Sequence, residues 1–282
     1  MDGHVRHDAG PRGLRALGLP NRRRDAAALR RAGARRRLRQ ARARPAAGDG
    51  MTAHELLLDA AAFRRMVTAA ADAVDAEHGA LSRLDAAAGD GDHGINLKRA
   101  MDAARSAVAR RPEESPGVLL GVVGEACAEE MGGAAGALFG GFFAAAAEML
   151  GDQPDMDGVT LAEALSAGAA RVAALGRAAV GDRSMVDALA PAADAARAAA
   201  RSGSGPADVL AAAAAAARRG ADGTRDLVPR VGRARYAADH AVGSADPGAT
   251  TVALILGAWA DAIKEERRMG VHEADDVVAG QR

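Results

Sequence analysis

Residues 84–96 read LDAAAGDGDHGIN, a glycine- and aspartate-rich loop that separates two helical patterns. Before the loop, apolar residues recur at helical spacing from Phe63 to Val74, and Asp59 occupies a favourable N-cap position. We expect a further short helix that holds Leu84 and Asp85. The stretch therefore connects helices, and it points to a helical protein.

The remaining sequence repeats this arrangement of helical patterns separated by glycine-rich breaks. The one candidate strand, Thr250 to Leu256, continues as an apolar run to Ala262, which favours a buried helix. Short connections favour antiparallel neighbours, so we expect an all-α fold, an antiparallel eight-helix barrel or bundle. Its later helices are predicted at 95–109, 117–131, 135–150, 160–178, 184–201, 206–220 and 248–269.

Composition sets the class of the protein. The chain has 282 residues, of which 49% are hydrophobic and only 2% aromatic, so alanine, leucine and valine must build the core. The single cysteine, Cys127, excludes an internal disulfide and is expected to be a core residue. No uninterrupted apolar stretch is long enough to span a membrane, and no signal peptide is evident. We expect a cytoplasmic protein that does not associate with membranes.

Charge is distributed unevenly along the chain. Residues 1–50 hold 14 Arg and 4 Asp, a net charge of +10, which the remaining residues balance to zero. A nucleic-acid arm or a transit peptide would also be basic, but a disordered extension is the simpler interpretation, and Met51 is a plausible true start. We predict an N-terminal extension at 1–50, one domain at 51–270 and a C-terminal tail at 271–282. We expect no nucleic-acid partner.

Three carboxylates, Asp85, Asp90 and Asp92, crowd the loop between the first helices. They repel one another unless a cation neutralises them, and magnesium commonly bridges carboxylates to phosphates. The helix that follows offers free N–H groups suited to phosphate. An Asp-Gly turn with capping aspartates would explain the same spacing equally well. An EF-hand loop fits poorly, and a Walker A loop is absent.

At these residues the sequence resembles the nucleotide-binding domain of dihydroxyacetone kinases, whose metal motif is L-D-x-x-x-G-D-G-D-H-G. Four further segments resemble family motifs, in the same order, and together the five cover about residues 54–260. The segments are Met131 to Gly136, Gly181 to Leu189, Gly232 to Ala234, and Asp246 to Thr250. The family's domain is either a separate L subunit or the C-terminal half of a single-chain kinase.

The resemblance implies a role for each matching residue. Asp85, Asp90 and Asp92 would bind two Mg²⁺ ions, and Arg233 would contact a phosphate of ADP or ATP. The other implied nucleotide-binding residues are His93, Gly94, Ile95 and Asn96 at a helix start, Ala134 and Ala135 by backbone, Gly176 and Met185 in the adenine pocket, and Asp246, Pro247 and Gly248 closing the site.

Several of these residues also have simpler interpretations. His93 could cap its helix, Met185 could fill the core, Arg233 could be a solvated loop charge, and Asp246 could start a turn. The sequence departs from the family pattern at Ala135, where a serine or threonine is usual. That departure removes a hydroxyl that would donate to a phosphate oxygen. Ser184 replaces a threonine and keeps its hydroxyl.

The resemblance implies a kinase subunit that phosphorylates dihydroxyacetone or a related short ketose held by a separate ketone-binding subunit. The phosphoryl donor is either ATP or a phosphohistidine carrier protein that recharges bound ADP, and the sequence does not separate the two. The sequence does not decide whether the subunit forms a homodimer. Fatty-acid kinases have a related domain, but they carry D-G-D-T-G where this chain has Asp90 to Gly94. The alternative from a different class is a nucleotide-sensing regulatory module without turnover.

Overall fold

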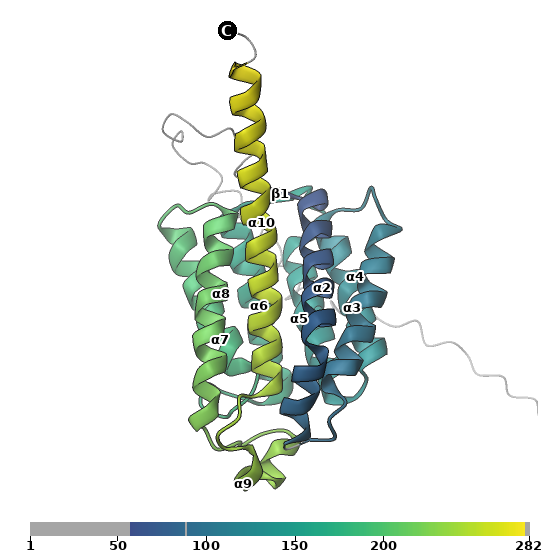
Figure 1. The fold of residues 1–282 in the computed structure, drawn as a ribbon, viewed down its shortest axis with the longest axis vertical. Coiled ribbons are helices and arrows are strands. Elements are labelled where there is room, and N and C mark those ends of the chain that lie inside the picture. The colour runs from purple at the N-terminus through teal and green to yellow at the C-terminus, as the bar shows by residue number, and fades with distance from the viewer. Residues whose placement is uncertain (1–56, 88, 280–282) are drawn as a thin grey trace, which may run out of the picture. The chain divides into compact units, whose positions relative to one another are not determined.

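The computed structural model describes residues 57–87 and 89–279 (Figure 1). The predicted extension at 1–50 lies outside these residues. Eight long helices make up most of the described part: α2 (Ala60–Ala86), α3 (His93–Ala109), α4 (Pro116–Met131), α5 (Gly133–Leu150), α6 (Gly158–Gly176), α7 (Val186–Arg201), α8 (Pro206–Gly223) and α10 (Pro247–Ala279). Shorter elements are β1 (Leu58–Asp59), β2 (Asp155–Met156), the four-residue α9 (Ala238–Ala241), and two 3₁₀ turns at Thr224–Asp226 and Arg233–Tyr236.

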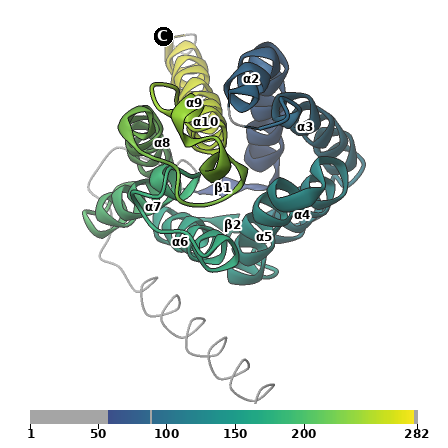
Figure 2. The same cartoon turned by 90° about the horizontal axis from the view of Figure 1, so that it is seen from below.

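The helices form a closed ring. Each long helix packs against the next one in sequence, and α10 packs against both α8 and α2, which closes the barrel (Figure 2). The short connections make neighbours antiparallel. As a result, α3, α5, α7 and α10 begin at the end of the barrel where α2, α4, α6 and α8 finish. The prediction of an all-α, antiparallel eight-helix barrel is confirmed.

Small residues and a few aromatic rings fill the barrel. The rings of Phe63 and Phe143 lie 6.5 and 6.2 Å from the ring of Trp259, centroid to centroid. Alanines bury much of the remaining interior, and they let the helices approach closely. Cys127 is fully buried, and burial raises the pKa of its thiol to about 12, so it stays an unreactive core residue.

Some local predictions need correction. The two helices expected before the acidic loop are one continuous helix, α2, which starts after the predicted cap Asp59. A helical glycine costs about 1 kcal/mol relative to alanine, but the buried face of α2 continues past Gly79 to Leu81 and holds the helix together. The two short strands were not predicted. They pair Leu58 with Met156, and so join the starts of α2 and α6.

The structure also differs from the predicted C-terminal boundary, and it contains two helices that bear on the membrane prediction. The backbone of α10 stays helical to Ala279, beyond the predicted boundary at 270. Two helices, α5 and α6, are long and apolar enough by length and composition to cross a membrane, although the sequence lacks a longer uninterrupted run. Each packs against helices on both sides within the ring. Core helices of soluble proteins meet the same criteria, and that is how we interpret these two.

Candidate functional site

A cavity of about 710 Å³ lies at the end of the barrel where α3, α5, α7 and α10 begin. Its wall contains the last residues of α2, α4 and α6, the first residues of α3, α5, α7 and α10, and the loop residues 231–234. Helix N-termini carry unpaired N–H groups and partial positive charge. The antiparallel topology therefore collects four helix N-termini around one cavity, which favours an anionic ligand.

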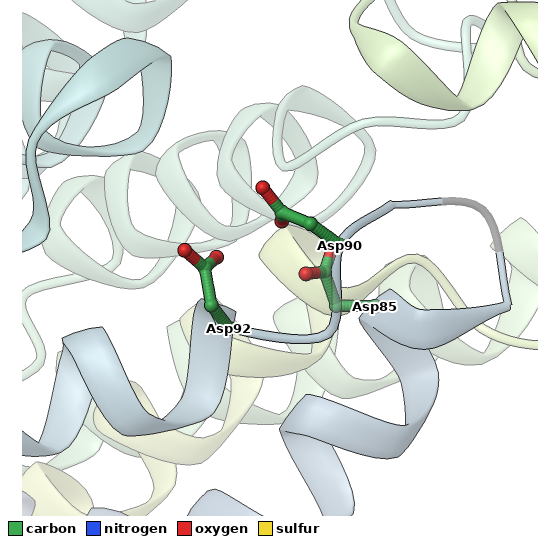
Figure 3. Close-up of side chains that lie close together, drawn as sticks. All are labelled: Asp85, Asp90 and Asp92. Atoms are coloured by element: carbon green, nitrogen blue, oxygen red, sulfur yellow. The ribbon is translucent and has the colours of Figure 1, made fainter.

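The three aspartates of the acidic loop meet at this cavity. One carboxylate oxygen from each of Asp85, Asp90 and Asp92 lies within 4.8 Å of the others. Figure 3 shows the three side chains, with Asp85 near the end of α2, Asp92 beside the start of α3 and Asp90 in the loop between them. Oxygen donors this close, two of them exposed, are the ligands that Mg²⁺ prefers.

Hydrogen bonds from backbone N–H groups to the Asp85 carboxylate hold the acidic loop in shape. Asp85 Oδ2 accepts from the backbone N–H of Gly91 at 2.9 Å and from that of His93 at 3.4 Å. Gly91 has φ +77°, a left-handed conformation that favours glycine. Asp85 therefore shapes the loop as well as facing the cluster, whereas Asp90 and Asp92 are exposed.

Arg233 reaches the acidic cluster from a distant part of the chain. Its guanidinium donates a hydrogen bond to Asp90 and forms an ion pair with it. This contact lowers the pKa of Asp90 and raises that of Arg233. The positive charge of Arg233 thus already compensates one of the three carboxylates, as expected where like charges lie close together.

A glycine pair starts the helix on another side of the cavity. Gly132, the residue before α5, and Gly133, its first residue, have φ +60° and +52°, and no heavy atom lies within 4 Å of where a side chain would begin. Ala134 and Ala135 follow in that first turn and line the cavity. Bare backbone therefore faces the cavity here, which allows a ligand to approach closely.

Apolar side chains make up a further part of the wall. Leu138 and Phe139 of α5, together with Val172 and Leu175 of α6, border the cavity next to Gly176. Met185 belongs both to this wall and to the buried core. The cavity thus combines charged groups with an apolar surface that can cover a planar, weakly polar group.

His93 opens α3 and is nearly buried. Its Nε2 lies 2.8 Å from the hydroxyl of Thr251 on α10, and burial lowers the pKa of its imidazole. The ring is therefore neutral at pH 7 and ties α3 to α10. The sequence offered no way to foresee a partner 158 positions away.

Asp246 is buried at the start of α10, where it acts as a cap. Its Oδ2 accepts from the backbone N–H of Ala249 at 2.7 Å, and its own N–H donates to Thr224 Oγ1 at 2.8 Å. Burial raises the pKa of Asp246 to about 6. A side chain on the neighbouring Gly248 would press on Met185, so the glycine allows α10 to start close to α7.

The structure brings together nearly all residues implied by the resemblance. Thirteen of the fifteen line the cavity, Asn96 and Pro247 among them. The two others do not: the Ile95 side chain is 54% exposed, and Gly94 instead faces the backbone carbonyl of His78, where a Cβ would clash at 1.9 Å. Arg183, which no sequence pattern singled out as a site residue, also lines the cavity although it is buried.

The sequence of the chain matches a known family. The model of the DAK2 domain matches residues 87–261. The match spans more than half of the chain, so this protein belongs to the DAK2 domain family.

Two curated relatives and one solved structure show how the domain occurs elsewhere. The chain is 37% identical to L-erythrulose kinase of Pectobacterium atrosepticum, over 68% of this chain and 33% of that protein. It is 31% identical to the ADP-binding subunit DhaL of the PEP-dependent dihydroxyacetone kinase of Escherichia coli, over 71% of this chain and 95% of that subunit. Dihydroxyacetone kinase of C. freundii, solved with AMP-PNP and Mg²⁺, superimposes with a TM-score of 0.55 at 27% identity, over 78% of this chain and 37% of that one. The chain thus spans about a third of the erythrulose kinase and of the C. freundii kinase, and nearly all of the DhaL subunit.

Proposed function

We propose that this chain is the nucleotide-binding module of a kinase for dihydroxyacetone or a related short ketose. It holds ADP or ATP with Mg²⁺ and works in the cytoplasm with a ketone-binding subunit. The observation that carries the proposal is the cluster of Asp85, Asp90 and Asp92 in a cavity that also has four helix N-termini and an apolar wall. Its relatives are named as kinases for erythrulose and dihydroxyacetone.

The residues fit magnesium. All three side chains offer oxygen, and the ion pair between Arg233 and Asp90 supports a site that favours positive charge. Two ions would be held by the three aspartates together with phosphate oxygens. When bound, Mg²⁺ neutralises charge on the phosphates that develops during transfer.

The chain's own residues orient the nucleotide. Arg233 would donate to a phosphate oxygen of the nucleotide, and metal held by the aspartates would compensate the charge of Asp90 in its place. The N–H groups of Ala134 and Ala135 face the phosphates from the first turn of α5. The base packs on the apolar wall beside Gly176 and Met185. Phosphoryl transfer depends mostly on such positioning and on electrostatics.

A partner presents the ketose substrate. The match to nearly all of a separate subunit, and to a third of longer kinases, supports a module that needs a ketone-binding partner. The donor is either ATP or a phosphohistidine carrier that recharges bound ADP. The E. coli relative is named PEP-dependent, which favours the carrier for that protein.

Two measurements test the proposal. Calorimetry should detect binding of ADP or ATP with Mg²⁺ and much weaker binding with a chelator. A transfer assay should then give phosphorylated dihydroxyacetone or erythrulose when a ketone-binding subunit is added, with either ATP or a phosphohistidine carrier as donor. Nucleotide binding without any transfer would favour the regulatory sensor instead. A chain that binds neither nucleotide would contradict the proposal.

A further inference from the structure

Arg183 is a buried arginine beside the cavity whose guanidinium holds another segment of the chain. Its side chain is 2% exposed. Nη2 donates to the carbonyl oxygens of Ala241 at 2.6 Å and Ser244 at 2.9 Å, and to the Ser244 hydroxyl at 3.1 Å. Nε and Nη1 are buried and have no hydrogen-bond partner among the described residues. Burying a charged group in this way is costly, so a function is expected for it.

The backbone at Arg183 is strained and locally fixed. Its φ is +58°, a left-handed conformation that residues other than glycine rarely adopt. The buried carboxylate of Asp187 holds the turn from both sides, because it accepts from the backbone N–H of Gly181 and from that of Ser184 at 2.8 Å. Strain of this kind persists only where the surroundings enforce it, and it clusters at functional sites.

The segment that Arg183 holds is residues 227–246, which we call the arginine loop because it carries Arg233. Residues 231–234 line the cavity, yet no residue from 230 to 238 is buried. Few core contacts therefore position this part of the loop. It is attached instead by hydrogen bonds: the N–H of Arg230 donates to Asp182 O at 3.0 Å, and the N–H of Gly243 donates to Arg225 O at 2.9 Å.

Arg183 secures the C-terminal end of this loop. It bonds to two carbonyls and one hydroxyl just before Asp246, and the Asp246 carboxylate lies near enough to interact with the guanidinium charge. Removing the guanidinium would take one donor from each carbonyl. The Ala241 carbonyl would keep its bonds from the Ser244 backbone N–H and hydroxyl, whereas the Ser244 carbonyl would lose the donor that Arg183 supplies. The end of the loop would then be free to shift, and so would the reach of Arg233.

We propose that Arg183 is a positioning residue that fixes the arginine loop, so that Arg233 reaches the phosphates of the bound nucleotide. The proposal rests on the proposed function of the cavity. It assigns Arg183 an action through Arg233, not a contact with the nucleotide.

A double-mutant cycle tests this dependence. Affinity for ADP with Mg²⁺ is measured by calorimetry for the parent, Arg183→Met, Arg233→Ala and the double variant. If a charge-assisted hydrogen bond to phosphate is lost, each single variant should bind roughly 10- to 100-fold more weakly. Because Arg183 acts through Arg233, the double variant should bind no more weakly than Arg233→Ala. Multiplied losses in the double variant would overturn the proposal.

The matched control is Arg197→Met, an arginine on α7 that is 43% exposed and paired with Asp194. Its nucleotide affinity should equal that of the parent. If the parent itself binds no ADP with Mg²⁺, the proposed function fails, and the next measurement judges Arg183 by itself.

Hydrogen exchange in the nucleotide-free protein gives that second readout. In Arg183→Met, the amides of Arg230 and Gly243 should exchange faster, while amides in the middle of α7 and α8 keep the parent rates. Arg183→Lys keeps the charge but presents one compact ammonium group, so its exchange rates at Arg230 and Gly243 should fall between those of the parent and those of Arg183→Met. Arg183→Lys also replaces Arg183→Met as the test variant if the methionine variant does not fold. Faster exchange throughout the barrel would mean that Arg183 serves the fold as a whole, and unchanged loop rates would also overturn the proposal.

Discussion

Replacing Asp90 by asparagine separates the role of this residue in metal binding from any role in the fold. The Asp90 side chain is 48% exposed, and its one described ion pair is with the 68% exposed Arg233. Exposed pairs contribute only about 0–1 kcal/mol, so Asp90→Asn should unfold close to the melting temperature of the parent. Asp85 would be a poorer choice, because its carboxylate also accepts two backbone N–H groups of the loop.

The expected loss of nucleotide affinity is much larger than the effect on stability. Even residues that only support metal ligands change metal affinity by about 10- to 100-fold when removed. A direct ligand should cost at least that much, which is about 1.4–2.7 kcal/mol of binding free energy. Loss of the Arg233 pair offsets part of this, since the nucleotide complex no longer has to break that pair. The offset is at most about 1 kcal/mol, so the net effect stays a weakening.

The assay is calorimetry of ADP in the presence of Mg²⁺ and again with a chelator. With the offset included, Asp90→Asn should bind ADP at least about twofold and up to about 100-fold more weakly with Mg²⁺, while the chelator should have little further effect. Asp72→Asn is the matched control, because Asp72 is a similarly exposed aspartate that pairs with Arg105 at 2.8 Å, away from the cluster. If Asp90→Asn and Asp92→Asn both bind ADP as well as Asp72→Asn does, the metal assignment is wrong.

Three further predictions follow from the same structure. Ala135→Ser should fold normally and bind ADP up to about tenfold more tightly, since a hydroxyl in the first turn of α5 could donate to a phosphate; clearly weaker calorimetric binding would mean that the loop differs from the family's. Removing residues 1–50 should shift the melting temperature by no more than a few degrees, because the described core starts at Leu58, and a larger drop would mean that the extension packs on the barrel. The pKa of Asp246 is raised from 3.8 to about 6 by burial, so the folded state holds an extra proton in that range, and stability falls as the pH rises through it. In Asp246→Asn this loss is absent, so the melting temperature of the variant minus that of the parent should grow between pH 4 and pH 6 and then level off, whereas a constant difference would contradict the raised pKa.

The acidic cluster could be predicted from the sequence because its members are close along the chain. Asp85, Asp90 and Asp92 lie within eight positions, between a helix end and a helix start, so local geometry alone brings the carboxylates together. The helices were predictable for a similar reason, since apolar periodicity and alanine content act locally. Their ends were less certain: the backbone of α10 stays helical well past the predicted end.

The sequence by itself determined the helical class and the acidic loop, and it placed most of the residues that share the cavity. Only the tertiary structure decided which distant groups meet them. Arg233 lies 143 positions from Asp90, and Arg183 reaches carbonyls about 60 positions away. Such contacts exist because α10 closes the ring against α2 and α8, which gathers four helix N-termini and the arginine loop at one end of the barrel. Ring closure depends on the sum of all helix contacts, and no local pattern records it.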